Sequence, residues 1–190
     1  MKYVFLMLLS MVFQAGVSQG VDSLWFTRSG KIYFISHTDI IDIDATNNQV
    51  GSFLNCKSGE LAFTLLMKTF QFTLPLAEEH FNENYVESEK YPKSTFKGKI
   101  LQFDPSRLME GIEYPVEVEG DLMLHGVTAR IKEKGTLKKS GGEIHANSDF
   151  SIALDTYKIK VPDIVKDRVA PVIPIKINMI YKPYSKGESK

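Results

Sequence analysis

The chain has 190 residues, with 23 Lys or Arg and 23 Asp or Glu, so its formal net charge at neutral pH is zero. This balance argues against a nucleic-acid partner, because nucleic acid binding requires a basic face on the protein. The single cysteine, Cys56, cannot form an internal disulfide, so we expect an apolar core to stabilise the fold.

The first residues have the pattern of a signal peptide. Lys2 is followed by a short apolar run over residues 3–13 and then by a zone of small residues. We therefore expect residues 1–20 to be removed on export, which leaves one domain at 21–184 and a polar tail at 185–190. The mature protein is expected in the periplasm or outside the cell. No later apolar run reaches the roughly 20 residues that a membrane-spanning helix needs.

Two-residue alternation dominates the domain. Phe70, Phe72 and Leu74, for example, alternate with polar residues. Because successive strand residues point to opposite faces, each such segment has one buried and one solvated face. Strands are predicted in chain order at residues 31–36, 49–54, 59–67, 68–74, 94–103, 116–124, 127–138, 143–154 and 172–182. Many strands separated by Asn, Asp and Gly turns predict an all-β sandwich or closed barrel.

One segment, residues 75–92, lacks this alternation and is rich in Glu and Asn. Leu76, His80 and Glu83 have helical spacing, and Pro75 suits the first position of a helix. The segment therefore predicts a short helix and a loop between two strands. Its carboxylates interleave with Asn and Lys, which favours a solvated helix face over a pair of catalytic acids.

The residue types that usually carry chemistry form no recognisable constellation. The histidines are His37, His80, His125 and His145. They show no metal-ligand spacing, and the sequence contains no nucleophile elbow, P-loop or dinucleotide motif. We therefore expect no catalytic residue, no metal and no cofactor. His125 is interpreted as a turn residue bonded to the backbone, whereas His80 lies in the helix-loop, where a cavity could open.

Alternation leaves the state of the interior open. A barrel of about eight strands is just wide enough to be filled by side chains or to hold one small ligand. The inward-facing Phe, Leu, Ile and Val residues could form a packed core, which periodicity alone favours, or could line a cavity.

Three parts of the chain resemble the YceI-like family of exported proteins. They are residues 79–85 with 89–98 (EHFNENY and EKYPKSTFKG), residues 120–128 (GDLMLHGVT), and residues 148–150 with 155–157 and 161–162 (SDF, DTY and VP). Their order and spacing fit the family over about residues 31–181. The strand that ends in the LHGVT turn is the most specific of the three.

The resemblance implies a lipocalin-like, extended antiparallel β-barrel of about eight strands with a short helix-loop insertion. It also implies that the interior holds a polyisoprenoid or a similar long-chain lipid, as in members of the family. The family's common Arg-Asp pair before the helix-loop is replaced here by residues 77–80, AEEH. This departure leaves the head-group contact undefined.

The resemblance and the two-faced strands together predict an exported, non-enzymatic protein that holds a polyisoprenoid, a quinone-like molecule or another long-chain apolar ligand. The expected ligand-binding residues are Phe70, Phe72, His80, Phe81, Tyr85, Phe96, Leu122, Leu124, Phe150 and Ile152. The alternative is a solid-cored β-barrel that acts as a protein-interaction or structural module, with residues 155–171 and its outer faces as the working surface. The sequence leaves a homodimer open in both cases.

Overall fold

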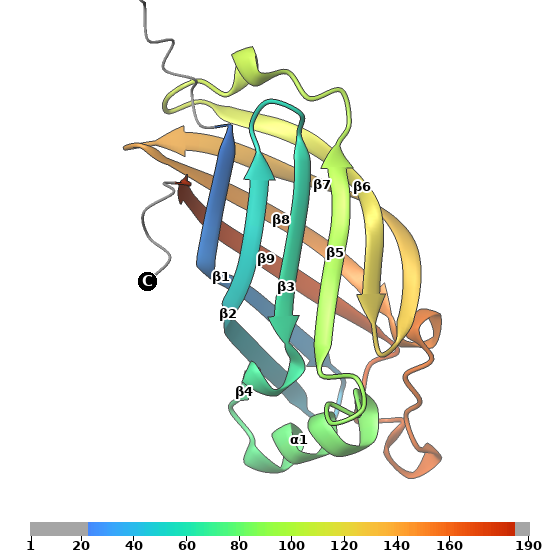
Figure 1. Cartoon of the computed structure of the whole chain (residues 1–190). Coiled ribbons are helices and arrows are strands. Elements are labelled where there is room, and N and C mark those ends of the chain that lie inside the picture. Colours follow the sequence, from blue (N-terminus) through green and yellow to red (C-terminus); the bar gives the residue numbers. More distant parts are fainter. Residues whose placement is uncertain (1–22, 185–190) are drawn as a thin grey trace, which may run out of the picture.

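The computed structural model of the chain describes residues 23–184, most of which lie in β-strands (Figure 1). The predicted signal peptide at 1–20 lies outside the described residues, as does the polar tail at 185–190. The strands are β1 (Leu24–His37), β2 (Asp42–Asn55), β3 (Glu60–Leu66), β4 (Gln71–Phe72), β5 (Lys93–Ile100), β6 (Glu113–Leu124), β7 (Val127–Ser140), β8 (Glu143–Ala153) and β9 (Val172–Pro183). The helical elements are η1 (Met67–Thr69), α1 (Pro75–His80), η2 (Phe81–Tyr85), η3 (Pro105–Arg107), η4 (Leu154–Tyr157) and η5 (Asp163–Val165). Over residues 23–184, no helix is long and apolar enough to cross a membrane.

Eight of the strands close into an antiparallel barrel. Their hydrogen-bonded order is β1-β9-β8-β7-β6-β5-β3-β2, and β2 pairs back onto β1 to complete the ring. The two-residue strand β4 pairs with β2 beside the ring. The predicted all-β fold, with a barrel of about eight strands and one short helix, is confirmed.

The strand predicted at 68–74 is wrong for most of its length. The chain instead forms the 3-10 turn η1, and only the two residues of β4 pair with a neighbour. The buried side chain of Asn47 explains the difference, because its amide donates to Leu66 O at 3.2 Å and to Thr69 Oγ1 at 2.7 Å. These bonds hold the chain in a turn. Asn47 itself lies inside β2.

The first strand is longer than the predicted 31–36 because it continues through an irregular point. The register between β1 and β2 shifts on both sides of Gly30. A Cβ atom at Gly30 would collide with Sδ of Met179, so a larger residue there would require the Met179 side chain to move. A glycine inside a strand commonly marks a bulge or a close approach of this kind.

The helix predicted within residues 75–92 is present and lies at one end of the barrel. α1 begins at Pro75 and runs directly into the π-helical turn η2. The backbone N–H of Phe72 donates to the Glu78 carboxylate at 3.2 Å, which ties α1 to β4. Figure 1 places α1 at the end of the barrel where the turns that follow β8 also lie.

The far end of the barrel is tightly packed. Gly98 of β5 lies opposite Gly120 of β6, and a Cβ on either residue would collide with backbone atoms and with the ring of Phe96. The two glycines therefore provide the space that the Phe96 ring occupies. Phe96 is 3% exposed and stacks on Phe63 with ring centroids 5.4 Å apart.

The strands β7 and β8 stay paired over only part of their length. Their ladder runs from the Gly135–Ser148 pair to the Ser140–Glu143 pair. Toward α1 they part: residues 127–134 pair with β6 alone, and the C-terminal part of β8 pairs with β9 alone. The η4 turn, with its buried Tyr157, contacts β7 in this region. The barrel is therefore wider at the end that carries α1.

Candidate functional site

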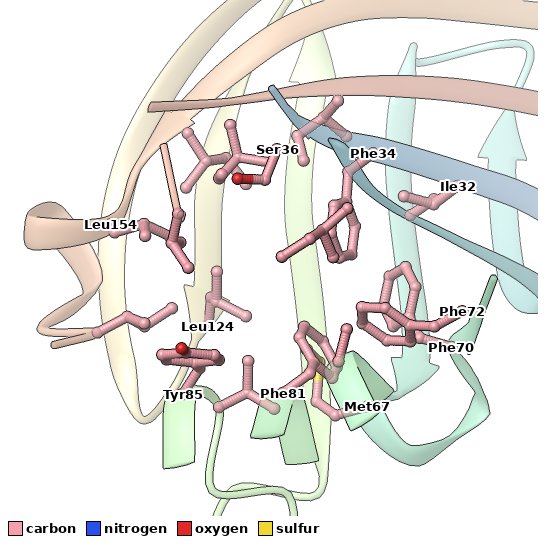
Figure 2. Close-up of a pocket in the computed structure, with 18 of the residues that line it drawn as sticks. Ile32, Phe34, Ser36, Met67, Phe70, Phe72, Phe81, Tyr85, Leu124 and Leu154 are labelled. Atoms are coloured by element: carbon pink, nitrogen blue, oxygen red, sulfur yellow. The ribbon is translucent and has the colours of Figure 1, made fainter. Parts of the chain in front are cut away.

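A cavity of about 420 Å³ occupies the wide end of the barrel. This volume lies within the range of about 300–1,000 Å³ that is typical of small-molecule sites. Inward-facing side chains of β1, β2, β3, β4, β5, β6, β8 and β9 form its wall, and α1, η2 and residues 154–169 surround one end. Nearly all of these side chains are apolar (Figure 2).

Four phenylalanines form one side of this large cavity: Phe34, Phe70, Phe72 and Phe81 (Figure 2). The ring centroid of Phe81 lies 5.0–5.8 Å from those of the other three. Such separations are typical of favourable aromatic pairs. The cluster packs the helical segment against β1 and β4, and it explains why Phe70 and Phe72 face inward although most of their predicted strand is absent.

The helical side of the large cavity also carries two polar residues, His80 and Tyr85. The side-chain amide of Asn84 lies 3.0 Å from Nδ1 of His80. An amide nitrogen can only donate, so Nδ1 accepts this hydrogen bond and the neutral ring carries its proton on Nε2. Partial burial raises the pKa of Tyr85 above its usual value of 10.0, so its hydroxyl is protonated at neutral pH.

The opposite side of the opening is formed by residues 154–169, which contribute Leu154, Ile159, Val165 and Arg168 to the lining. Hydrogen bonds donated by two backbone N–H groups hold this segment in place. Leu154 N donates to Pro171 O at 3.0 Å, and Ala170 N donates to Ser36 Oγ of β1 at 2.9 Å. An irregular segment is thereby fixed next to the cavity.

His125 joins the two sides of the opening without lining the cavity. Its Nε2 lies 2.8 Å from the Glu87 carboxylate, after η2, and its Nδ1 lies 3.0 Å from Tyr157 O, in η4. The ring of Tyr91 packs edge-on against it at 4.6 Å. The hydrogen bond from His125 is the main reason that the pKa of Glu87 is lowered. The interpretation of His125 as a turn residue bonded to the backbone is confirmed.

A second cavity of about 90 Å³ lies deeper in the barrel. Phe63, Phe150 and Ile177 border both cavities and form a partition between them. Tyr181 also borders the small cavity, and its hydroxyl lies 2.7 Å from Ser52 Oγ, which donates to Ala62 O at 2.9 Å. Burial raises the pKa of Tyr181 to about 12.

The structure brings nine of the ten predicted ligand-binding residues to the large cavity. They are Phe70, Phe72, His80, Phe81, Tyr85, Leu122, Leu124, Phe150 and Ile152. Phe96 is the exception, because its ring is packed over the two glycines and borders only the small cavity. Contact of these residues with a ligand remains a prediction.

Sequence reasoning missed the other lining residues, and two groups of them show why. Ile32 and Phe34 of β1 were not selected, because Tyr33 and Ile35 make the other face of the strand apolar as well. Arg168 was assigned, with the rest of residues 155–171, only to the working surface of the alternative and not to the cavity, because it lies in an irregular segment with no periodicity.

Two further observations concern chemistry outside the cavity. Burial raises the pKa of the Cys56 thiol to about 11, so the thiol is almost wholly protonated at neutral pH and is a weak nucleophile. Over residues 23–184, no group of three or more His, Cys, Asp and Glu side chains could hold a metal ion.

Known proteins share both the sequence pattern and the fold. A family model described as the YceI-like domain matches residues 27–180. No curated protein is similar in sequence at a significant level.

Three solved structures are similar in fold. A polyisoprenoid binding domain from Saccharophagus degradans, implicated in plant cell wall breakdown, is 13% identical with a TM-score of 0.74, over 85% of this chain and 99% of that one. Burkholderia cenocepacia BcnA is 14% identical with a TM-score of 0.67, over 80% and 95%. A Campylobacter jejuni YCEI protein is 16% identical with a TM-score of 0.60, over 77% and 88%.

Proposed function

Because the chain belongs to the YceI-like family, we propose that it is an exported binding protein that holds a polyisoprenoid, a quinone-like molecule or another long-chain apolar ligand inside its barrel. The proposal assigns it no catalytic step. The neighbour described as a polyisoprenoid binding domain supports this class of ligand.

The large cavity is the observation that carries the proposal. Its wall is built mainly from Phe, Leu and Ile side chains of seven strands, and it reaches the partition at Phe150. A ligand chain placed there would gain about 25 cal/mol for each Å² of apolar surface removed from water. Water in the same space would find few polar partners, which a buried water needs.

The alternative, a solid-cored barrel that serves as an interaction module, requires an interior filled by side chains. That description fits the interior around Phe96, whose ring is 3% exposed. The large cavity favours the binding protein over this alternative.

Extraction of the purified protein tests the proposal. The chain is expressed with its leader in a Gram-negative host, purified without detergent, and extracted with organic solvent for mass spectrometry. We expect one class of long-chain compound in near-stoichiometric amount, and none from an unrelated exported barrel purified in parallel. A protein that yields no such compound, and that binds no added polyprenol, quinone or fatty acid, would rule out the proposal.

Export is tested on the same preparation. Cell fractionation should place the protein outside the cytoplasm, and N-terminal sequencing should begin near residue 21. A cytoplasmic protein that retains Met1 and Lys2 would contradict export while leaving the binding proposal intact.

A further inference from the structure

The large cavity has few polar lining residues, and those that are His, Lys, Arg, Asp or Glu are all basic. Two lining residues have basic side chains, His80 and Arg168, and no carboxylate of residues 23–184 belongs to the lining. Two serines also line it, but both are engaged. Ser36 Oγ accepts from Ala170 N, and Ser94 Oγ donates to Met123 O at 2.8 Å. The remaining polar groups are donors located on α1, η2 and the segment before β9.

Arg168 is positioned by its backbone and has no carboxylate partner in the part of the chain that the structure describes. Its N–H donates to Val165 O at 2.9 Å, and both Val165 and Val169 line the cavity beside it. None of the salt bridges formed among residues 23–184 includes Arg168. The nearby Asp163 pairs with Lys166 instead. The guanidinium therefore keeps its capacity to bind a ligand.

His80 and Tyr85 add donors of the same kind. With Nδ1 of His80 accepting from Asn84, the ring proton on Nε2 remains available to a ligand. The Tyr85 hydroxyl is protonated at neutral pH, because partial burial raises its pKa. A set of donors with a fixed positive charge matches a head group that only accepts hydrogen bonds.

We propose that the ligand is an amphiphile with an anionic head, a carboxylate or a phosphate, and that Arg168 binds this head while the apolar chain extends toward Phe150. This inference rests on the proposed function and narrows its ligand class. The planar guanidinium fork fits both carboxylate and phosphate oxygens, which an ammonium group does less well. Arg168 thereby provides a head-group contact that the AEEH sequence at 77–80 left undefined.

Matched ligands of one chain length separate the head from the tail. Delipidated mature protein is titrated by calorimetry with hexadecanoate, hexadecyl phosphate and hexadecanol, each below its aggregation limit. The proteins are wild type, Arg168→Met, Arg168→Lys and the control Lys166→Met. This control also removes one positive charge, but from a side chain that does not line the cavity.

For Arg168→Met we expect Kd to rise about tenfold for one or both anions, as for a lost charge-assisted hydrogen bond. The Kd for hexadecanol should change by less than about twofold, Arg168→Lys should restore part of the anion affinity, and Lys166→Met should be silent. The anion with the larger effect identifies the head group.

Two results overturn the inference while leaving the proposed function standing. In one, Arg168→Met has no effect on either anion although hexadecanol and the anions bind to wild type. In the other, Arg168→Met weakens the binding of hexadecanol as much as that of the anions, which would make Arg168 a packing residue. If wild type binds none of the three amphiphiles, this inference fails, and the proposed function fails with it only if the extraction yields no long-chain compound and no polyprenol or quinone binds. Arg168 and Lys166 are exposed, and circular dichroism of each variant checks that the substitution leaves the barrel folded.

Discussion

Apolar side chains alternate along the strands at both ends of the barrel, but they pack closely at only one end. At the narrow end β7 and β8 are fully paired, and Ile144 of β8 is 0% exposed. At the wide end the two strands part beyond Gly135 and Ser148, and Ile152 on the same face of β8 lines a cavity of about 420 Å³. Both isoleucines are apolar and point inward.

The difference shows that facing inward and packing are separate properties. Side-chain alternation determines which residues face the interior. The distance across the barrel, which depends on how the strands pair, determines whether those residues meet. The η4 turn occupies the side where β7 and β8 diverge, so that the ring stays covered although its interior is not filled.

The largest expected effect is on stability. Ile144→Ala should cost about 2–5 kcal/mol of unfolding free energy, because it removes three carbons from a close-packed site and leaves a new cavity. Ile152→Ala, the matched change eight residues along the same face, should cost roughly 1 kcal/mol, since this side chain already borders empty space. Urea denaturation of the ligand-free proteins measures both. Equal losses would mean that the wide end is as tightly packed as the narrow one.

The next effect is on binding. Leu122→Trp places a larger side chain in the large cavity and should weaken the binding of a long-chain ligand by roughly a hundredfold, since overpacking costs about 1–3 kcal/mol. Met123→Trp is the control, because this neighbour points to the outer face and does not line either cavity. Calorimetric titration with a single long-chain ligand gives both values. Similar affinities for the two variants would place the ligand elsewhere.

A smaller effect concerns the partition between the two cavities. Phe150→Ala should join them and admit a longer chain, and each additional buried CH₂ contributes about 0.8 kcal/mol. If two of the four additional CH₂ groups of icosanoate are buried, the gain is about 1.6 kcal/mol, so we expect the preference for icosanoate over hexadecanoate to rise about tenfold, measured by displacement of a fluorescent fatty acid. Phe96→Ala, which changes only the small cavity, should leave the preference near its wild-type value. An unchanged preference in Phe150→Ala would show that the chain does not reach the partition.

The smallest effect concerns the contact between Glu87 and His125 at the wide end. The hydrogen bond from His125 lowers the pKa of Glu87 below its ordinary value of 4.5. Since the pKa is lower in the folded than in the unfolded chain, this carboxylate stabilises the fold above pH 4.5, and its contribution is lost as the pH falls through the folded pKa.

Glu87→Gln should therefore be slightly less stable than wild type near neutral pH, and the gap should close in acid. Thermal unfolding as a function of pH measures the gap. Glu83→Gln, a change in the exposed part of η2, is the control and should show no such trend. A stability difference between wild type and Glu87→Gln that widens in acid would contradict the prediction.

Much of this fold was predictable from the sequence, for reasons that particular residues make clear. The alternation of Ile144, Ile152 and their neighbours predicted inward faces correctly, and Pro75 marked the start of α1. The turn at η1 was not predictable, because it depends on Asn47, a residue some twenty positions away in the chain. The same holds for Arg168, which reaches the cavity only through the path of an irregular segment.

The cavity itself lay beyond sequence reasoning. Phe96 and Phe150 occupy similar apolar positions in the alternating pattern of their strands. Phe96 is nevertheless packed against two glycines, whereas Phe150 separates two cavities. The choice between them depends on where β7 leaves β8, and local periodicity does not report strand pairing of that kind.

The central claim is that the wide end of the barrel holds a single apolar chain. A crystal structure of the mature protein with hexadecanoate brominated at its tail tests it most directly, because bromine can be located by anomalous scattering. We predict one bromine site inside the large cavity, close to Leu122 and Phe150. Bromine found only on the outer surface, with the cavity filled by repacked side chains, would contradict the account.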